Sequence, residues 1–150
     1  MKTRPRIVIA GAGFGGLFAL LSLARKFGRD EADIVIIDRH KYFLFTPLLH
    51  EVATGTLGQR EVTEPLAPFA RRAGAEFLQD EIKGIDLKNQ EVILESKRIP
   101  YDILLCVCGA VTNNRSVLGV SEYAFPLKNL PDALRLHKHL LDIFQKASSE

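Results

Sequence analysis

Six residues near the start of the chain have the types and spacing of a phosphate-binding loop. The segment GAGFGG at residues 11–16 satisfies the pattern G-x-G-x-x-G. In this pattern Gly11 permits a tight turn, Gly13 lets the backbone approach a pyrophosphate, and Gly16 allows a helix to pack closely on a sheet. Asp38 follows about 20 residues later, where a carboxylate can accept a hydrogen bond from a ribose hydroxyl. These residues predict a dinucleotide-binding site, and the charge of Asp38 disfavours the 2′-phosphate of NADP.

The flanking residues predict the elements that would position this loop. A continuous apolar run at residues 7–10 predicts a buried strand, and apolar residues from Leu17 to Phe27 recur at helical spacing. A β-branched run at residues 34–37 then predicts a second strand, so that strand, helix and strand make one βαβ unit. The uncharged stretch 7–24 could also be a secretory signal or a membrane span, but the βαβ interpretation excludes both because the glycines lie at a turn. An α/β protein whose glycines serve only packing is the alternative.

The rest of the chain predicts a mixed α/β domain with a small β-meander inserted from about Glu76 to Ser96. The last apolar run, residues 103–108, is expected to return to the central parallel sheet. The other expected helices are a short one in a loop near Pro47, one begun by Thr63 and Pro65 and stopped by Gly74, and one over 130–147 capped by Asn129. Strands are expected over 75–87, 90–96 and 101–108, with turns at 88–90 and 97–98.

Composition and charge narrow the classes of partner. Hydrophobic residues make up 47% of the chain and charged residues 25%, which is typical of a globular protein. The net charge of +2 gives no reason to expect nucleic acid or an anionic membrane as a partner. Cys106 and Cys108 cannot form a disulfide framework, and their spacing places both on one face of a strand. We expect two small buried residues and an intracellular, reducing location.

Other chemistries lack the residues that they need. Leu17 and Phe18 stand where a P-loop requires Lys and Ser or Thr. His50 has no second histidine four positions later, as a zinc-protease helix would, and no serine lies in a G-x-S-x-G elbow. His137 and His139 are two positions apart on a predicted helix, so they are poor partners for one metal ion. We therefore predict no metal site and assign no catalytic side chain.

Five segments occur in an order and at distances that are typical of one family. They are IVIAGAGFGGL, IVIIDRHKYFLFTPLLHEVATG, EIKGIDL, YDILLCVCGA and AFPLKNLPDALRLHKHLLDIF. Together they resemble the N-terminal flavin-binding part of the type II NADH:quinone oxidoreductases, within the pyridine nucleotide-disulfide oxidoreductase-like superfamily. The resemblance covers residues 6–147. Its most specific part is the block YFLFTPLL…VATG, which makes FAD the expected dinucleotide.

The resemblance implies a Rossmann-like α/β FAD/NAD(P)-binding domain over residues 1–150, with a parallel central sheet. It implies that the pyrophosphate of FAD is held by Gly11, Gly13, Phe14, Gly15 and Gly16, and the adenosine ribose by Asp38 and Arg39. It also implies that Thr46 and Pro47 lie near the flavin and that the backbone of Ile82 contacts the adenine. Cys108 and Gly109 would contact FAD at the end of a central strand. The sequence departs from the family at three positions: Phe43 stands in place of a frequent His, Thr46 of a frequent Gln, and Cys108 of a more usual Thr or Ser.

The implied reaction is hydride transfer from NADH to FAD, followed by electron transfer to a quinone. Family members also carry a second, nicotinamide-binding Rossmann unit and C-terminal helices that attach to the membrane, and this sequence contains no second G-x-G-x-x-G. We therefore expect an incomplete enzyme without a transmembrane segment. Its expected location is cytoplasmic, and peripheral on the cytoplasmic face of the membrane if the protein is full-length, and a homodimer is left open. The alternatives are another Rossmann-type NAD-dependent oxidoreductase and a non-catalytic dinucleotide-binding remnant.

Overall fold

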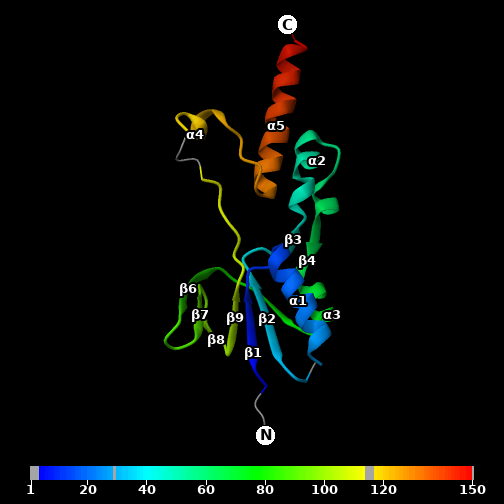
Figure 1. Ribbon diagram of the computed structural model, residues 1–150. Helices are drawn as coiled ribbons and strands as arrows, with labels where there is room; N and C mark the ends of the chain where they lie inside the picture. Colours follow the sequence, from blue (N-terminus) through cyan, green and yellow to red (C-terminus); the bar gives the residue numbers. More distant parts are fainter. Residues whose placement is uncertain (1–3, 29, 114–116, 150) are drawn as a thin grey trace. The chain divides into compact units, whose positions relative to one another are not determined.

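The computed structural model describes residues 4–28, 30–113 and 117–149 (Figure 1). The chain forms two compact units. The first unit contains residues Met1–Phe43 and Pro65–Gly109, and the second contains Leu44–Glu64 and Ala110–Glu150. Among the described residues, no helix combines the length and the apolar composition that a membrane crossing requires.

A four-stranded parallel sheet forms the centre of the first unit, with strand order β5-β2-β1-β9 (Figure 1). Its strands are β1 (Arg6–Ala10), β2 (Asp33–Asp38), β5 (Glu76–Gln79) and β9 (Ile103–Cys106). In the register of the sheet, Val8 lies opposite Val35 on one side and Leu104 on the other. Because β1 and β2 are the central strands and are covered on both faces, their residues form near-continuous apolar runs.

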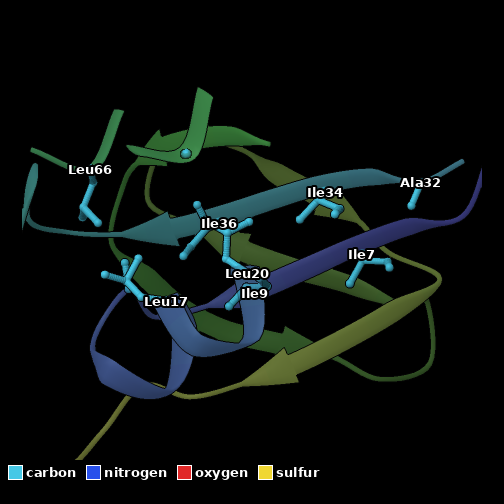
Figure 2. Close-up of a cluster of buried hydrophobic side chains, with 10 residues drawn as sticks. Ile7, Ile9, Leu17, Leu20, Ala32, Ile34, Ile36 and Leu66 are labelled. Carbon is cyan, nitrogen blue, oxygen red and sulfur yellow. The ribbon is translucent and has the colours of Figure 1, made fainter. Parts of the chain in front are cut away.

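Two helices cover one face of this sheet. Helix α1 (Phe14–Lys26) connects β1 to β2, and helix α3 (Leu66–Arg72) leads into β5. Figure 2 shows Leu17 and Leu20 of α1 over Ile9 and Ile36 of the sheet. Ile9, Leu20 and Ile36 have no accessible surface, and each such side chain contributes about 1.5–3 kcal/mol through burial.

An antiparallel β-meander covers the opposite face. It consists of β6 (Ile82–Asp86), β7 (Glu91–Leu94) and β8 (Arg98–Pro100). Val92 and Ile99 of the meander belong to a second buried cluster with Val8 and Val35 of the sheet. Successive residues of β1 and β2 thus alternate between the two clusters, as the period of two in a strand requires.

Two expected boundaries near the meander are wrong. Residues Glu76–Gln79 belong to the parallel sheet, where they pair with β2, because Phe77 packs on one buried cluster and Leu78 on the other. The expected single strand over 75–87 is interrupted at Asp80, whose N–H donates to the carbonyl oxygen of Asp38. Arg98, expected in a turn, begins β8, because Ile99 beside it is buried.

The expected helix start near Thr63 is also wrong. Thr63–Pro65 forms strand β4, which pairs with β3 (Tyr42–Leu44) in a two-stranded sheet. Helix α3 begins only at Leu66, because Pro65 has extended backbone angles and the N–H of Leu66 donates to the carbonyl oxygen of Lys41 at 3.0 Å. Pro65 is therefore both the last residue of β4 and the N-cap residue of α3.

The second unit is mostly helical. Its elements are the 3₁₀ helices η1 (Thr46–Leu48) and η2 (Gln59–Val62) and the helices α2 (Leu49–Thr54), α4 (Val120–Tyr123) and α5 (Leu130–Ala147). Helices α2 and α5 pack against each other, with Leu49 and Val52 buried on α2 and Leu130 and Ala133 buried on α5. The short helix predicted near Pro47 is confirmed.

Helix α5 has the predicted bounds and the predicted cap. The side chain of Asn129 accepts a hydrogen bond from the N–H of Asp132 at 2.9 Å, and the Asp132 carboxylate accepts one from the N–H of Asn129 at 3.2 Å. This reciprocal pair is a capping box. The predicted apolar face is buried only at the start of the helix, since Leu141 and Phe144 near its end are 48% and 68% exposed.

Replacing Asn129 by alanine is expected to destabilise α5 by about 1 kcal/mol, because the first turn loses its side-chain acceptor. The measurement is thermal unfolding followed by circular dichroism. Asn129→Asp is the matched control, since aspartate caps helices as well as asparagine does. An alanine variant that melts with the wild type would contradict a stabilising role for the cap.

Candidate functional site

The glycine-rich loop lies where the carboxyl ends of three strands meet. Ala10, the last residue of β1, lies opposite Ile37 of β2 and Cys106 of β9. The chain leaves β1 toward β2 on one side, and β9 returns on the other side, so the loop lies at the topological switch point of the sheet. In parallel α/β sheets, ligands bind outside the carboxyl ends of the strands at such a point.

Gly11 makes the tight turn that its position in the pattern predicts. Its φ is +108°, a region that residues with a side chain rarely adopt. A Cβ at Gly11 would also lie 2.5 Å from the carbonyl oxygen of Val107, and the Gly11 N–H donates to the carbonyl oxygen of Ile37 at 2.8 Å. Gly11 is therefore required both by its conformation and by the neighbouring end of β9.

Gly16 lets the first turn of α1 approach the loop closely. A Cβ at Gly16 would lie 1.9 Å from the carbonyl oxygen of Gly11 and 3.5 Å from the Ile9 side chain. The predicted close packing of the helix is thus present, and the nearest atom is backbone of the glycine loop itself.

Gly13 differs from both, because none of the described residues requires a glycine there. Its φ is −75°, which every residue type can adopt. Across the part of the chain that the structure describes, no atom beyond the chain neighbours lies within 4 Å of the position that a Cβ at Gly13 would take. Gly13 is exposed, so this open space faces outward. A glycine facing open space fits a position where the backbone is approached by a group from outside the protein.

The start of α1 favours an anion in that space. Gly13 is the N-cap residue, and within the described residues no side chain caps the helix and no acidic residue lies in its first turn. A helix N-terminus presents backbone N–H groups and the positive end of the helix dipole. The loop and helix together therefore offer N–H donors and partial positive charge to a phosphate.

Asp38 has a structural role that its sequence position did not reveal. One oxygen of its carboxylate accepts a hydrogen bond from the N–H of Ala12 at 2.8 Å, and the other accepts one from the N–H of His40 at 2.8 Å. Asp38 thus ties the glycine loop to the end of β2. A carboxylate has about four lone-pair sites, so these bonds leave acceptor capacity for a ribose hydroxyl.

At the end of β9, the two cysteines differ from the expectation, and Val107 has a role that was not predicted. Cys106 and Cys108 are both exposed, so the prediction of two buried cysteines is wrong. Val107 between them takes the inward position: its side chain packs on the buried cluster under α1, and its N–H donates to the carbonyl oxygen of Ala10 at 2.9 Å. β9 is an edge strand of the sheet, and its last residue, Cys106, is exposed. Partial burial, together with the nearby Cys106, raises the pKa of the Cys108 thiol.

The other predicted contact residues lie as follows. Gly15 is exposed, and a Cβ added to it would lie 3.4 Å from the Val107 side chain. Gly109 has a φ of +75°. The Phe14 ring packs edge-on against Phe43, with 5.0 Å between the ring centroids.

Arg39 is exposed, and its carbonyl oxygen accepts a hydrogen bond from the Gln79 amide at 3.2 Å. Ile82 is half-buried in β6, where the register with β7 shifts between Ile82 and Gly84. Thr46 and Pro47 are exposed in η1 of the second unit. The structure thus brings the glycines, Asp38 and the end of β9 together, while the contacts assigned to these other residues stay predictions.

The histidines of α5 have neighbours within the second unit. A ring nitrogen of His137 lies 3.1 Å from the carbonyl oxygen of Ala53, and the His139 ring stacks on Phe125. Among the described residues there is no group of three or more side chains that could hold a metal ion.

Comparison with known proteins decides the family. Residues 5–147 match the pyridine nucleotide-disulphide oxidoreductase family. The chain belongs to this family. Within it, the chain is 30% identical over 143 residues to the type II NADH:quinone oxidoreductase of Staphylococcus haemolyticus, covering 95% of this chain and 36% of that protein. The resemblance stated from the sequence is therefore confirmed.

Solved structures of oxidoreductases share the fold. NDH2 of Plasmodium falciparum, solved in complex with NADH, is 30% identical with a TM-score of 0.83, covering 97% of this chain and 30% of that one. The sulfide:quinone oxidoreductase of Aquifex aeolicus is 26% identical with a TM-score of 0.86, covering 94% and 32%. These similarities confirm the predicted Rossmann-like α/β fold class. The chain spans about a third of the length of these relatives.

Proposed function

We propose that this chain is the FAD-binding portion of an NADH:quinone oxidoreductase. The observation that carries the proposal is the open space in front of Gly13, which is the N-cap residue of α1 in the loop that follows the central strand β1. The similarity to a type II NADH:quinone oxidoreductase supports FAD as the dinucleotide, and residues 1–150 would form the FAD-binding domain.

The residues at the loop fit the pyrophosphate of such a cofactor. Backbone N–H groups from Gly13 to Gly16 would donate to its oxygens, and Gly13 leaves the space that this approach needs. The remaining acceptor sites of Asp38 would take a ribose hydroxyl, with Arg39 beside it.

The other contacts proposed for FAD are Thr46 and Pro47 near the flavin, Ile82 at the adenine, and Cys108 and Gly109 at the end of β9. When bound, FAD supplies the chemistry of accepting a hydride and passing electrons to a quinone, while this chain binds and orients it.

NADH and a quinone are proposed as the substrates of the whole enzyme, and no contact with either is assigned to the residues described here. The relatives are about three times as long as this chain, so residues outside the matched region would contribute to those steps. No catalytic side chain is proposed for this chain, because the cofactor carries the reaction.

Titration of the purified chain with FAD and, separately, with NADH tests the proposal. We expect FAD to bind with the lower dissociation constant, measured by the change in flavin fluorescence and checked by equilibrium dialysis. Tighter binding of NADH would instead favour another Rossmann-type NAD-dependent oxidoreductase. Binding of neither compound would contradict the proposal and favour a non-catalytic remnant.

A further inference from the structure

Asp80 lies where the chain leaves the parallel sheet and enters the β-meander. It follows Gln79, the last residue of β5, and comes two positions before Ile82, the first residue of β6. The N–H of Asp80 donates to the carbonyl oxygen of Asp38, the last residue of β2, at 3.1 Å. Asp80 therefore connects the end of β2 to the start of the meander.

The carboxylate of Asp80 extends the connection between β6 and β7 beyond the ends of these strands. One of its oxygens accepts a hydrogen bond from the N–H of Glu81 at 2.7 Å. The other accepts one from the hydroxyl group of Ser96 and one from the N–H of Ser96, the latter at 3.4 Å. The bond from the Ser96 hydroxyl lowers the pKa of the Asp80 carboxyl, so this group is ionised at neutral pH. Its bonds are therefore those of a charged acceptor, which are stronger than bonds between neutral groups.

The same bonds hold the backbone that leads to Ile82. The N–H of Glu95 donates to the carbonyl oxygen of Glu81 at 3.0 Å, and Ile82 then lies opposite Leu94 of β7. Beyond Ile82 the register of the two strands shifts, so regular pairing does not continue directly on that side. The bonds made at Asp80 therefore contribute to fixing the position of Ile82.

The proposed function places the adenosine half of FAD at the two segments that Asp80 connects. The ribose would contact the Asp38 carboxylate, and the adenine would contact the backbone of Ile82. We propose that Asp80, together with Ser96, is a positioning residue that sets the separation between Asp38 and Ile82 for the adenosine of FAD. This inference rests on the proposed function, and Asp80 is assigned no contact with the cofactor itself.

Loss of the Asp80 carboxylate should change this separation without unfolding the meander. Val92, Leu94 and Ile99 would remain buried against the sheet. Glu81 and Ser96 are exposed, so the groups that lose their acceptor can bond to water instead. The start of β6 would keep its strand and lose its anchor.

Titration with FAD, followed by flavin fluorescence, tests this role in variants that circular dichroism shows to be folded. We expect Asp80→Ala to raise the dissociation constant of FAD about 10-fold. Ser96→Ala should raise it by a smaller factor, because the N–H of Ser96 still donates to Asp80. Ser96→Thr keeps the hydroxyl group and is expected to bind FAD as the wild type does.

Asp86→Ala is the matched control, at the other end of β6. The Asp86 carboxylate accepts hydrogen bonds from the N–H groups of Lys88 and Asn89 at 3.1 and 3.0 Å, and from the Asn89 amide at 2.8 Å. Its removal weakens the same meander away from Ile82, so the affinity for FAD should stay that of the wild type. A role in the stability of the meander alone would instead affect both aspartate variants alike.

Wild-type affinity in Asp80→Ala, or an equal loss of affinity in Asp86→Ala, would overturn this inference and leave the proposed function standing. A wild-type chain that binds no FAD would overturn the proposed function and this inference with it. Where Asp80→Ala fails to fold, the two serine variants decide. Weaker binding by Ser96→Ala than by Ser96→Thr supports the inference, and equal binding overturns it.

Discussion

Replacing Gly16 by alanine is expected to destabilise the first unit by about 3 kcal/mol or more, the upper end of the range for overpacked sites. The added Cβ would lie 1.9 Å from the carbonyl oxygen of Gly11. That oxygen belongs to backbone and cannot rotate away as a side chain would. Gly11 is itself held by its hydrogen bond to Ile37 and by the nearby end of β9, so the loop has little freedom to move.

Urea denaturation followed by circular dichroism measures this effect through the free energy of unfolding. Gly13→Ala is the matched control, because its Cβ would meet open space and its backbone angles suit alanine. The control is expected to unfold with the wild type, within about 0.5 kcal/mol. A Gly16→Ala chain as stable as this control would show that the loop and α1 do not approach each other as described.

Replacing Gly13 by valine is expected to weaken FAD binding by about 100-fold or more, which corresponds to about 2.7 kcal/mol or more. The branched side chain would occupy the space through which the pyrophosphate is proposed to reach the backbone N–H groups. The same substitution should leave the fold intact, since no described atom beyond the chain neighbours lies within 4 Å of the new Cβ and the φ of −75° is allowed.

The measurement is the FAD titration, repeated on the variant. Gly28→Ala provides a control at the other end of α1, where the added Cβ would be no closer than 3.4 Å to a neighbouring atom. This control is expected to bind FAD as the wild type does. Unchanged affinity in the Gly13 variant, with binding present in the wild type, would refute the assignment of the pyrophosphate to this loop.

Elements that depend on local residues could be predicted from the sequence. The βαβ unit follows from two apolar runs that surround a glycine loop and an amphipathic helix, all within one short stretch. Helix α5 could be predicted with both ends, because Asn129 and Asp132 make its cap from neighbouring residues. The glycine pattern likewise predicted the turn at Gly11 and the close packing at Gly16.

Features that depend on distant partners could not be predicted in this way. The strand Glu76–Gln79 reads as part of a meander until its pairing with β2 is known. The burial of Cys106 and Cys108 was predicted from an apolar run, but both side chains are exposed where β9, an edge strand, ends. The bond from Asp38 to the N–H of Ala12 joins two segments that only the folded sheet brings together.

The order of strands in the parallel sheet has a consequence for when the glycine loop takes its final shape. Strand β2 follows β1 after a single helix, whereas β9 returns to β1 only at Ile103. Contacts between residues far apart in the chain form slowly, because a long loop must close first. Val107, whose carbonyl oxygen lies beside Gly11, directly follows β9 in the chain and reaches its place when β9 pairs with β1. During synthesis, the glycine loop would therefore leave the ribosome well before β9 and take its final shape only after β9 has paired with β1.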